Sequence, residues 1–600
     1  MNWTVFFIIS LSCLLSAVAA AIILAKTKYK RGRILDPTTI IFAGVVVSAV
    51  ILFIPVCIST YREKNLGGFE TVMVSIHNML RLFVVDGEFT QVTTNLQDIT
   101  PTMFRCYTAL FSVLFVTAPV LTFGFVLSFF KNTSAYYRFM THFWTDTFIF
   151  SELNEKSLTL AASLYENKDK KRFFVFTDVY EKEDAFSKEL VERAKELGAV
   201  YFENDILVNN FAFHSKKKDL YFFMIGDDQS KNISQGLKII ERYQYRENSH
   251  LYVFSNQVES ELLLTNAFNN EQANADGKKS QIKVRRVNEV RSLIYRTLYE
   301  DGFQKIFSTA HEEDGIKHIH AIVIGMGQHG VEMTKALSWF CQMDGYQAKI
   351  SCFDKDKKAD EKFISLCPET MDPRLNGHFD IPGESRNDIT VYPNMDVDSL
   401  EFDKLFQSLP RSTYIFVALG NDEKNISIAV KLRMLAARMG HTPAIHAVIY
   451  NTEKKEALTG IVNFKNQPYD INFIGDMKSS CSENVILGSD IEALALQRHI
   501  KWGSENHFWQ YDYNYKSSIA SAIHRQMKIL CKIPGSDKDP KDRTEEELWG
   551  MRILEHCRWN AYMRSEGYVF SEKRYDLAKT HHCLIPFADL PLAEQIKDDD

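Results

Sequence analysis

The residues best suited to bind a charged ligand are Gly325, Gly327 and Gly330, spaced G-x-G-x-x-G in the stretch HAIVIGMGQHGVEM. The first glycine of this pattern allows a tight turn, the second lets a phosphate approach the backbone, and the third lets a helix pack closely on a strand. Phosphates would lie at the amino terminus of the following helix, where free N–H groups and the helix dipole favour anions. The spacing therefore predicts nucleotide binding, and the alternative is a Rossmann turn that no longer holds a ligand.

Residues that follow neighbouring strands complete this predicted site. Asp354 ends the next strand, where an acid would bind ribose hydroxyls, and Asp356 is the alternative. Gly420 and Asn421 follow another predicted strand and are assigned to the same site. The ligand is predicted to be a nucleotide or dinucleotide, and NAD(H), ATP or ADP, and a nucleotide second messenger all remain open.

The strands that would position these residues alternate with helices, which predicts a parallel α/β, Rossmann-like domain. A helix is expected from Gly330 to about Met343, another after Lys424, and one long helix over residues 483–499. The expected strands cover residues 320–325, 348–354, 388–393, 413–419, 444–451 and 471–476.

An earlier block repeats this plan. Its DLYFFMIGDDQSKNIS (219–234) matches TYIFVALGNDEKNIS (413–427), with an apolar strand, a turn and an identical KNIS, so we interpret the blocks as a duplication. Its first expected strand runs into FVFTDVYEKED without glycine, which predicts a scaffold or dimerisation copy. Asp227 and Asp228 are interpreted as a solvated turn, with a cation site as the alternative. Strands are expected over residues 172–178, 198–204, 219–225 and 250–256, and a helix over 183–198.

The amino-terminal quarter is apolar and differs from the rest. Runs over residues 3–25, 38–60 and 107–130 are each long enough to cross about 30 Å of hydrocarbon. The first run contains SAVAA, which resembles a signal-peptide cleavage site, but no basic residue precedes it and it continues past the alanines. The predicted location is the inner (plasma) membrane. The link after the first run is basic, which predicts an outside amino terminus and cytosolic carboxy-terminal domains; its cations are Lys26, Lys28, Lys30, Arg31 and Arg33.

The segment between the second and third runs is the next candidate for a membrane role. Residues 69–85 are apolar with a few polar interruptions, which fits a re-entrant helix or an amphipathic helix on the membrane surface. A potassium filter would require a TVGYG-like run, and the sequence has none.

Composition and motifs exclude several functions. A net charge of -6 gives no footprint for nucleic acid, and ten cysteines without a CxxC pair indicate reduced thiols. The sequence contains no HExxH, G-x-x-x-x-G-K-[ST] or G-x-S-x-G motif, so we predict no enzyme and name no catalytic residue.

Residues 172–502, with membrane helices before them, resemble the RCK or TrkA-N family, which regulates potassium channels and transporters. The resemblance implies a homo-oligomer, a dimer or a tetrameric ring, that changes shape when a nucleotide or cation binds. The missing filter departs from that pattern and puts potassium conduction in doubt.

The last hundred residues carry LWGMRILEHCRWNAYMRSEGY (548–568), expected to be helical, and then KRYDLAKTHHCLIPFADLPLAEQIKD (573–598). They resemble the small domain repeated in ryanodine receptors (RyR). The resemblance implies a pocket for a nucleotide-derived ligand, and the alternative is that the same side chains simply form a core. The matching positions are His556, Trp559, Gly567, Tyr568, His581, Leu584, Phe587, Leu590, Pro591 and Glu594, and the pocket would comprise His556, Arg558, Trp559, Lys579 and His581.

A zinc site was weighed for the same segment. No metal site is predicted, because adjacent residues such as His582 and Cys583 rarely both face one ion. The other potential ligands are His556, Cys557 and His581.

We therefore expect a membrane domain (1–145), a degenerate Rossmann-like repeat (146–311), a second repeat with the glycine motif (312–503) and a mainly helical RyR-like domain (504–600). The expected function is a ligand-gated channel or membrane-disrupting effector that senses a nucleotide-derived signal, in a setting such as antiphage defence. The alternatives are a potassium channel or transport subunit regulated by NAD(H) or ATP, and a membrane-anchored NAD-dependent enzyme.

Overall fold

The computed structural model describes residues 2–26, 37–61, 67–83, 96, 99–167, 171–179, 185–272, 280–372 and 386–598. These residues form two compact units. The first comprises Met1–Phe143, Asp178–Tyr180 and Val200–Phe213, and the second comprises Trp144–Thr177, Glu181–Ala199 and His214–Asp600.

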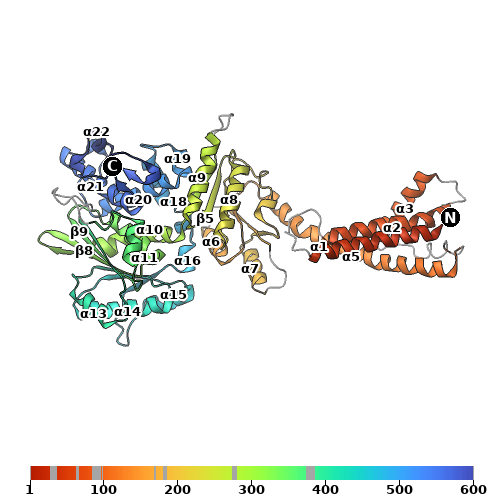
Figure 1. Ribbon diagram of the computed structural model, residues 1–600, viewed down its shortest axis with the longest axis horizontal. Coiled ribbons are helices and arrows are strands. Elements are labelled where there is room, and N and C mark those ends of the chain that lie inside the picture. Colours follow the sequence, from red (N-terminus) through yellow and green to blue (C-terminus); the bar gives the residue numbers. More distant parts are fainter. Residues whose placement is uncertain are drawn as a thin grey trace. The chain divides into compact units, whose positions relative to one another are not determined.

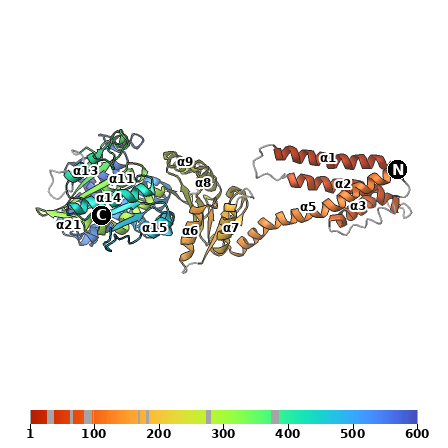
Figure 2. The same cartoon turned by 90° about the horizontal axis from the view of Figure 1, so that it is seen from below.

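Helices dominate the first unit, where α1, α2 and α5 lie side by side (Figure 2). Three of its segments are long and apolar enough to cross a membrane: Trp3–Ala21, Ile40–Ser59 and Pro101–Thr122. This confirms the predicted apolar helices and makes a membrane association plausible. The orientation stays a prediction, because most of the basic link lies outside the described residues. The helices are α1 (Trp3–Lys26), α2 (Pro37–Tyr61), α3 (Gly68–Phe83) and α5 (Pro101–Thr141).

Small residues hold α1 against α2. The buried hydroxyls of Ser10 and Ser48 lie 2.7 Å apart, and each donates to the carbonyl oxygen of the other residue. A Cβ built on Gly44 would lie 2.2 Å from the Cβ of Ala17, so only glycine allows this approach. Close contact through small residues with hydrogen bonds between helices is typical of helix pairs in lipid.

The helix α5 is longer than the predicted 107–130. Its 41 residues span about 60 Å, roughly twice the hydrocarbon thickness. The apolar run marked only part of it, because the helix continues through polar residues at both ends of that run. Near its end Tyr136 donates to Asn209 Oδ1 at 2.9 Å, and Phe139 packs edge-on against Phe211. Within the same unit, α3 turns one face inward through Ser75, Met79, Leu82 and Phe83.

After the apolar helices the chain forms two parallel sheets, which confirm the α/β, Rossmann-like class (Figure 1). Their orders, β3-β2-β1-β4-β5-β6 and β10-β9-β8-β11-β12-β13, are the same 3-2-1-4-5-6 arrangement, with β7 (His311–Glu313) antiparallel to β8. The first set contains β1 (Asp146–Phe150), β2 (Arg172–Thr177), β3 (Val200–Phe202), β4 (Leu220–Met224), β5 (Ser249–Phe254) and β6 (Lys283–Val287), with α6 (Glu155–Glu166), α7 (Ala185–Glu196), α8 (Gln229–Tyr243), α9 (Val258–Gln272) and α10 (Glu289–Gly302). The second contains β8 (Ile316–Ile324), β9 (Tyr346–Phe353), β10 (Arg386–Tyr392), β11 (Tyr414–Val417), β12 (Ala444–Val448) and β13 (Ile471–Ile474), with α11 (Gln328–Phe340), α12 (Ala359–Leu366), α13 (Leu400–Ser408), α14 (Asp422–Arg438) and α15 (Thr452–Leu458).

Two strands of the first sheet, β1 and β6, were not predicted. The five residues of β1 are too few for a periodic signal. The sequence of β6 (KVRRV) is too charged to resemble a buried strand, and its arginines are accommodated because they pair with carboxylates of other elements. The segment taken as the first strand is therefore β2. The turn that corresponds to the glycine motif is the one after β1, residues 151–154, and it too lacks glycine.

The two faces of the second sheet are covered differently (Figure 1). One packs on α13 and α14, while the core of the other continues through α10 and α11 into α18 (Ser489–His499), α20 (Asp512–Leu530) and α21 (Glu545–Ser565). Trp339 and Tyr562 meet edge-on across this boundary. The single helix expected over 483–499 is two, α17 (Glu483–Ile486) and α18, because Gly488 takes φ +53°.

Candidate functional site

Two of the three motif glycines are required by packing. Gly325 follows β8 with φ +90°, and a Cβ there would lie 2.3 Å from the Ala418 carbonyl oxygen. A Cβ on Gly330 would lie 1.7 Å from the Gly325 carbonyl oxygen. These positions bring the start of α11 directly over the end of β8, as the third glycine of the motif was expected to do.

The second glycine, Gly327, has a different environment. It caps α11, no side-chain hydrogen bond caps this helix among the described residues, and no described atom lies within 4 Å of a Cβ built there. Gly420 across the switch point, where β8 neighbours β11, also borders open space. Open space therefore borders the cap residue of α11 at the point where the strand order reverses, which is where such sheets bind ligands.

Asp354 lies beside this turn. Its Oδ2 accepts a 2.5 Å hydrogen bond from the Met326 N–H, and its Oδ1 accepts one from the Asp356 N–H. The carboxylate thus anchors the turn, and its remaining lone pairs are available to a hydroxyl. Asp356 instead pairs with Lys362 at 2.5 Å, and this cation lowers the pKa of the Asp356 carboxyl.

The shared KNIS sequence has a structural role in both repeats. Asn425, fully buried, accepts from the Leu419 N–H and donates to the Val448 carbonyl, so it ties the turn after β11 to β12. Asn232 makes the same connection between Gly226 and Phe254. Asn421, assigned to the nucleotide site, caps α14 through the Lys424 N–H.

The first repeat fills the equivalent position with its own side chain. Glu152, in the turn after β1, forms an ion pair with Lys231 on α8. Its carboxyl carbon lies 2.6 Å from where a Cβ on Gly226 would be, at the end of neighbouring β4. Asn154 caps α6 in a reciprocal capping box. An anion of the protein therefore already occupies this switch point.

The two acids weighed as a cation site sit at the start of α8. Asp228 caps this helix through the N–H groups of Ser230 and Lys231, and Asp227 is exposed. Capping is a sufficient reason for an acid at this position.

Three of the five residues assigned to the carboxy-terminal pocket come together. The ring of Trp559 lies 6.0 Å from that of His556 and 5.0 Å from that of His581. Arg558, fully buried, instead holds Glu555 at 2.8 Å, and Lys579 donates to the Glu566 carbonyl. The cations expected to hold a phosphate beside the indole are thus directed at other partners.

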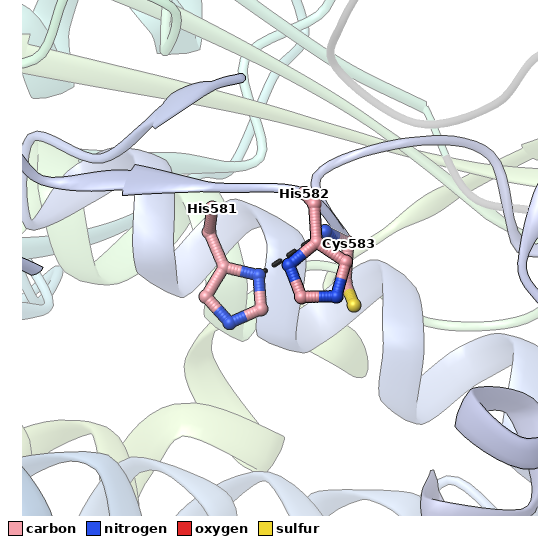
Figure 3. Close-up of side chains that lie close together, drawn as sticks. All are labelled: His581, His582 and Cys583. Atoms are coloured by element: carbon pink, nitrogen blue, oxygen red, sulfur yellow. Dashed lines mark hydrogen bonds between the residues drawn. The ribbon is translucent and has the colours of Figure 1, made fainter. Parts of the chain in front are cut away.

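Figure 3 shows the one group of potential metal ligands found among the described residues: His581, His582 and Cys583, whose ligand atoms lie within 4.8 Å of one another. The Nδ1 of His581 accepts a hydrogen bond from the Cys583 N–H, which uses that lone pair. Burial lowers the pKa of His581 to about 4, so the ring is neutral at pH 7. Two imidazoles and one thiol are a set that zinc accepts, but a structural zinc site takes four ligands.

The structure contains a basic cavity that was not predicted from the sequence. It is lined by Arg285, Arg286, Arg291, Arg296 and Lys516, together with polar and aromatic residues of α10, α17, α18 and α20. The signal was present in KVRRVNEVRSLIYR, where five cations fall within fourteen residues. It had no recognisable motif, because the lining comes from elements far apart in the chain.

The comparisons with known proteins identify no relative. No protein-family model matches this chain, and no curated protein matches it. What it does is therefore argued from its own residues and their geometry.

Proposed function

We propose that this chain is a ligand-gated inner-membrane protein, a channel or a membrane-disrupting effector, whose cytosolic domains sense a nucleotide-derived signal. The observation that carries the proposal is the uncapped amino terminus of α11 at Gly327, open at a sheet switch point, in a chain with three apolar spans. A ligand placed there would bring phosphate oxygens to free N–H groups.

The RyR-like interpretation of the last hundred residues belongs to this proposal. His556, Trp559 and His581 form an aromatic cluster, of which the partly exposed Trp559 would contact the base of a nucleotide. The nucleotide site on α11 would be a second input to the same switch. An antiphage role, in which an infection signal permeabilises the membrane, fits this arrangement. A homo-oligomer, dimer or tetramer, would sum several binding events, because each ligand shifts an equilibrium only by its differential affinity for the two states.

Ion flux from liposomes tests the function. Full-length protein would be reconstituted with a trapped dye and potassium, and ATP, NAD and cyclic dinucleotides would be added in turn. Flux that one nucleotide triggers, and that Gly327→Asp abolishes while Gly327→Ala does not, is the expected result. The added carboxylate would repel phosphate, whereas a methyl group fits the open space.

Other outcomes identify other functions. Flux selective for potassium would favour the transport subunit, and turnover of NAD without flux would overturn the channel proposal. Trp559→Ala tests the carboxy-terminal input. An unchanged nucleotide response in a folded Trp559→Ala protein would remove this cluster from the sensing mechanism.

A further inference from the structure

The cavity lined by Arg285, Arg286, Arg291, Arg296 and Lys516, here called the junction cavity, lies where three parts of the second unit meet. The first two residues come from β6, the next two from α10 and the last from α20. Its volume of about 60 Å³ holds several water molecules, since one water needs roughly 10–15 Å³. A phosphate group fits this space.

Ion pairs around the junction cavity join these three parts to one another. Arg286 on β6 lies 2.8 Å from Asp512 on α20. Arg291 on α10 lies 2.8 Å from Glu332 on α11 and 3.0 Å from Glu566 at the end of α21. These three contacts connect the first repeat to elements that follow it in the chain, so a change in any of them would alter how these elements are held together.

Several buried donors at this place lack a partner. Arg285 is only 7% exposed, and its Nε has no hydrogen-bond partner among the residues that the structure describes. The same holds for Arg291 Nη1 and for Nε1 of Trp509, which lines a smaller cavity that shares Arg285 and Arg286. Leaving a buried donor unpaired costs about 1–3 kcal/mol. Two such donors in the lining of the junction cavity, with a third in the adjoining smaller cavity, favour an acceptor bound there in another state.

Phosphate is the acceptor that this chemistry favours. Arginine offers parallel N–H groups that match phosphate oxygens, stays charged, and is weakly hydrated, so it suits partly buried anion sites. In the present arrangement the Asp512 carboxylate contacts both Arg286 and Lys516, the latter at 3.0 Å, and Glu261 lies 3.3 Å from each of the same two cations. A phosphate with more charge than a carboxylate would compete for these same cations.

We propose that the junction cavity binds the phosphate groups of a nucleotide-derived ligand, which replaces Asp512 as the partner of Arg286 and Lys516 and thereby loosens α20 from β6. The inference rests on the proposed function for the ligand's class and assigns its phosphates to a second site, distinct from Gly327. Binding would replace the ion pair between Arg286 on β6 and Asp512 on α20 by contacts with the ligand. A small anion would in this way favour the conformation in which β6 and α20 are no longer paired.

The test measures binding of pyrophosphate and of ATP to the full-length protein in detergent by calorimetry. Arg296→Gln leaves only the half-exposed Glu300 and Asp490 without their partner, so it should fold and weaken binding of both probes about tenfold. Asp512→Asn removes the nearer of two competing carboxylates, leaving Glu261, and should tighten binding about tenfold, a gain that misfolding does not produce. Arg193→Gln, which breaks a surface pair with Glu155, is the matched control and should change nothing.

The outcomes separate this inference from the proposed function. Binding that Gly327→Asp abolishes and that Arg296→Gln and Asp512→Asn leave unchanged would overturn the junction site while leaving the function intact. Binding that follows the junction variants, in a protein that shows no flux with any nucleotide, would support the site and overturn the function. If neither pyrophosphate nor ATP binds, the inference is wrong.

Discussion

The Nη2 of Arg286 lies 2.8 Å from Oδ2 of Asp512, although 226 positions separate the two residues in the chain. Both side chains are about nine-tenths buried, and Lys516 contacts the same carboxylate. The two cations lower the pKa of Asp512 well below its usual range, so this carboxylate stays charged at every physiological pH. The first sheet and α20 are thus joined by a buried charge pair.

Asp512→Asn is expected to destabilise the ligand-free protein by about 3 kcal/mol, because removing one partner of a buried pair leaves the other charge uncompensated. Thermal unfolding of the full-length protein in detergent measures the loss. Glu505→Gln breaks the more exposed pair with Lys283 and should cost under about 1 kcal/mol. Equal losses in the two variants would mean that the buried pair contributes no more than a surface pair.

The motif glycines should respond differently to one added methyl group. Gly330→Ala is expected to lower the unfolding free energy by about 1–3 kcal/mol, because its Cβ would meet the Gly325 carbonyl oxygen at 1.7 Å. Gly327→Ala should stay within about 0.5 kcal/mol of the wild type, since its φ of -71° suits alanine and the space is open. Denaturant unfolding compares them, and a Gly330→Ala protein as stable as the wild type contradicts the close packing.

Packing of α1 on α2 gives a prediction with an internal rescue. Gly44→Ala should destabilise the helix pair by about 1–3 kcal/mol through its collision with Ala17, and Ala17→Gly in the same chain should restore most of the loss. Unfolding by titration with SDS measures both. Gly68→Ala, which meets no described atom within 4 Å, is the control. Failure of the double variant to recover would show that the helices do not meet at these residues.

His320 should make stability depend on pH. Burial lowers its pKa from 6.5 to about 4, where Nδ1 faces the Pro410 carbonyl and Nε2 faces Ser351 Oγ. Between these values the unfolded chain binds a proton that the folded chain does not, so the stabilisation is present above about pH 6.5 and is lost as the pH falls toward 4.

The measurement compares the wild type with His320→Asn, which cannot titrate in this range. From pH 7 to pH 5 the wild type should lose about 2 kcal/mol more than the variant. Parallel pH profiles for the two proteins would mean that folding does not lower the pKa of His320.

Local signals predicted part of this structure well. The glycine turn and the strands at 219–225 and 413–419 were found because a motif and an apolar run are visible within a dozen residues. The KNIS repeat was also found, although its reason, one asparagine that ties two strand ends together, appears only in the structure.

The junction cavity could not be predicted in this way. Its lining comes from residues 285–296, 484–491 and 512–519, which only the folded arrangement brings together. The strand β6 was not predicted, because a charged pentapeptide shows no strand periodicity. In the folded protein its two arginines pair with carboxylates of other elements. Ion pairs between residues far apart in the chain give no signal in the local periodicity of the sequence.

Glu152 makes the two repeats differ in the turn that follows the first strand of each sheet. An anion attached by covalent bonds cannot diffuse away, so the charge at this turn of the first repeat does not depend on any ligand in solution. At the second repeat Gly327 carries no side chain and no side-chain hydrogen bond caps α11. Under the proposed function only this second copy would respond to the concentration of a nucleotide, while the first copy would stay unchanged.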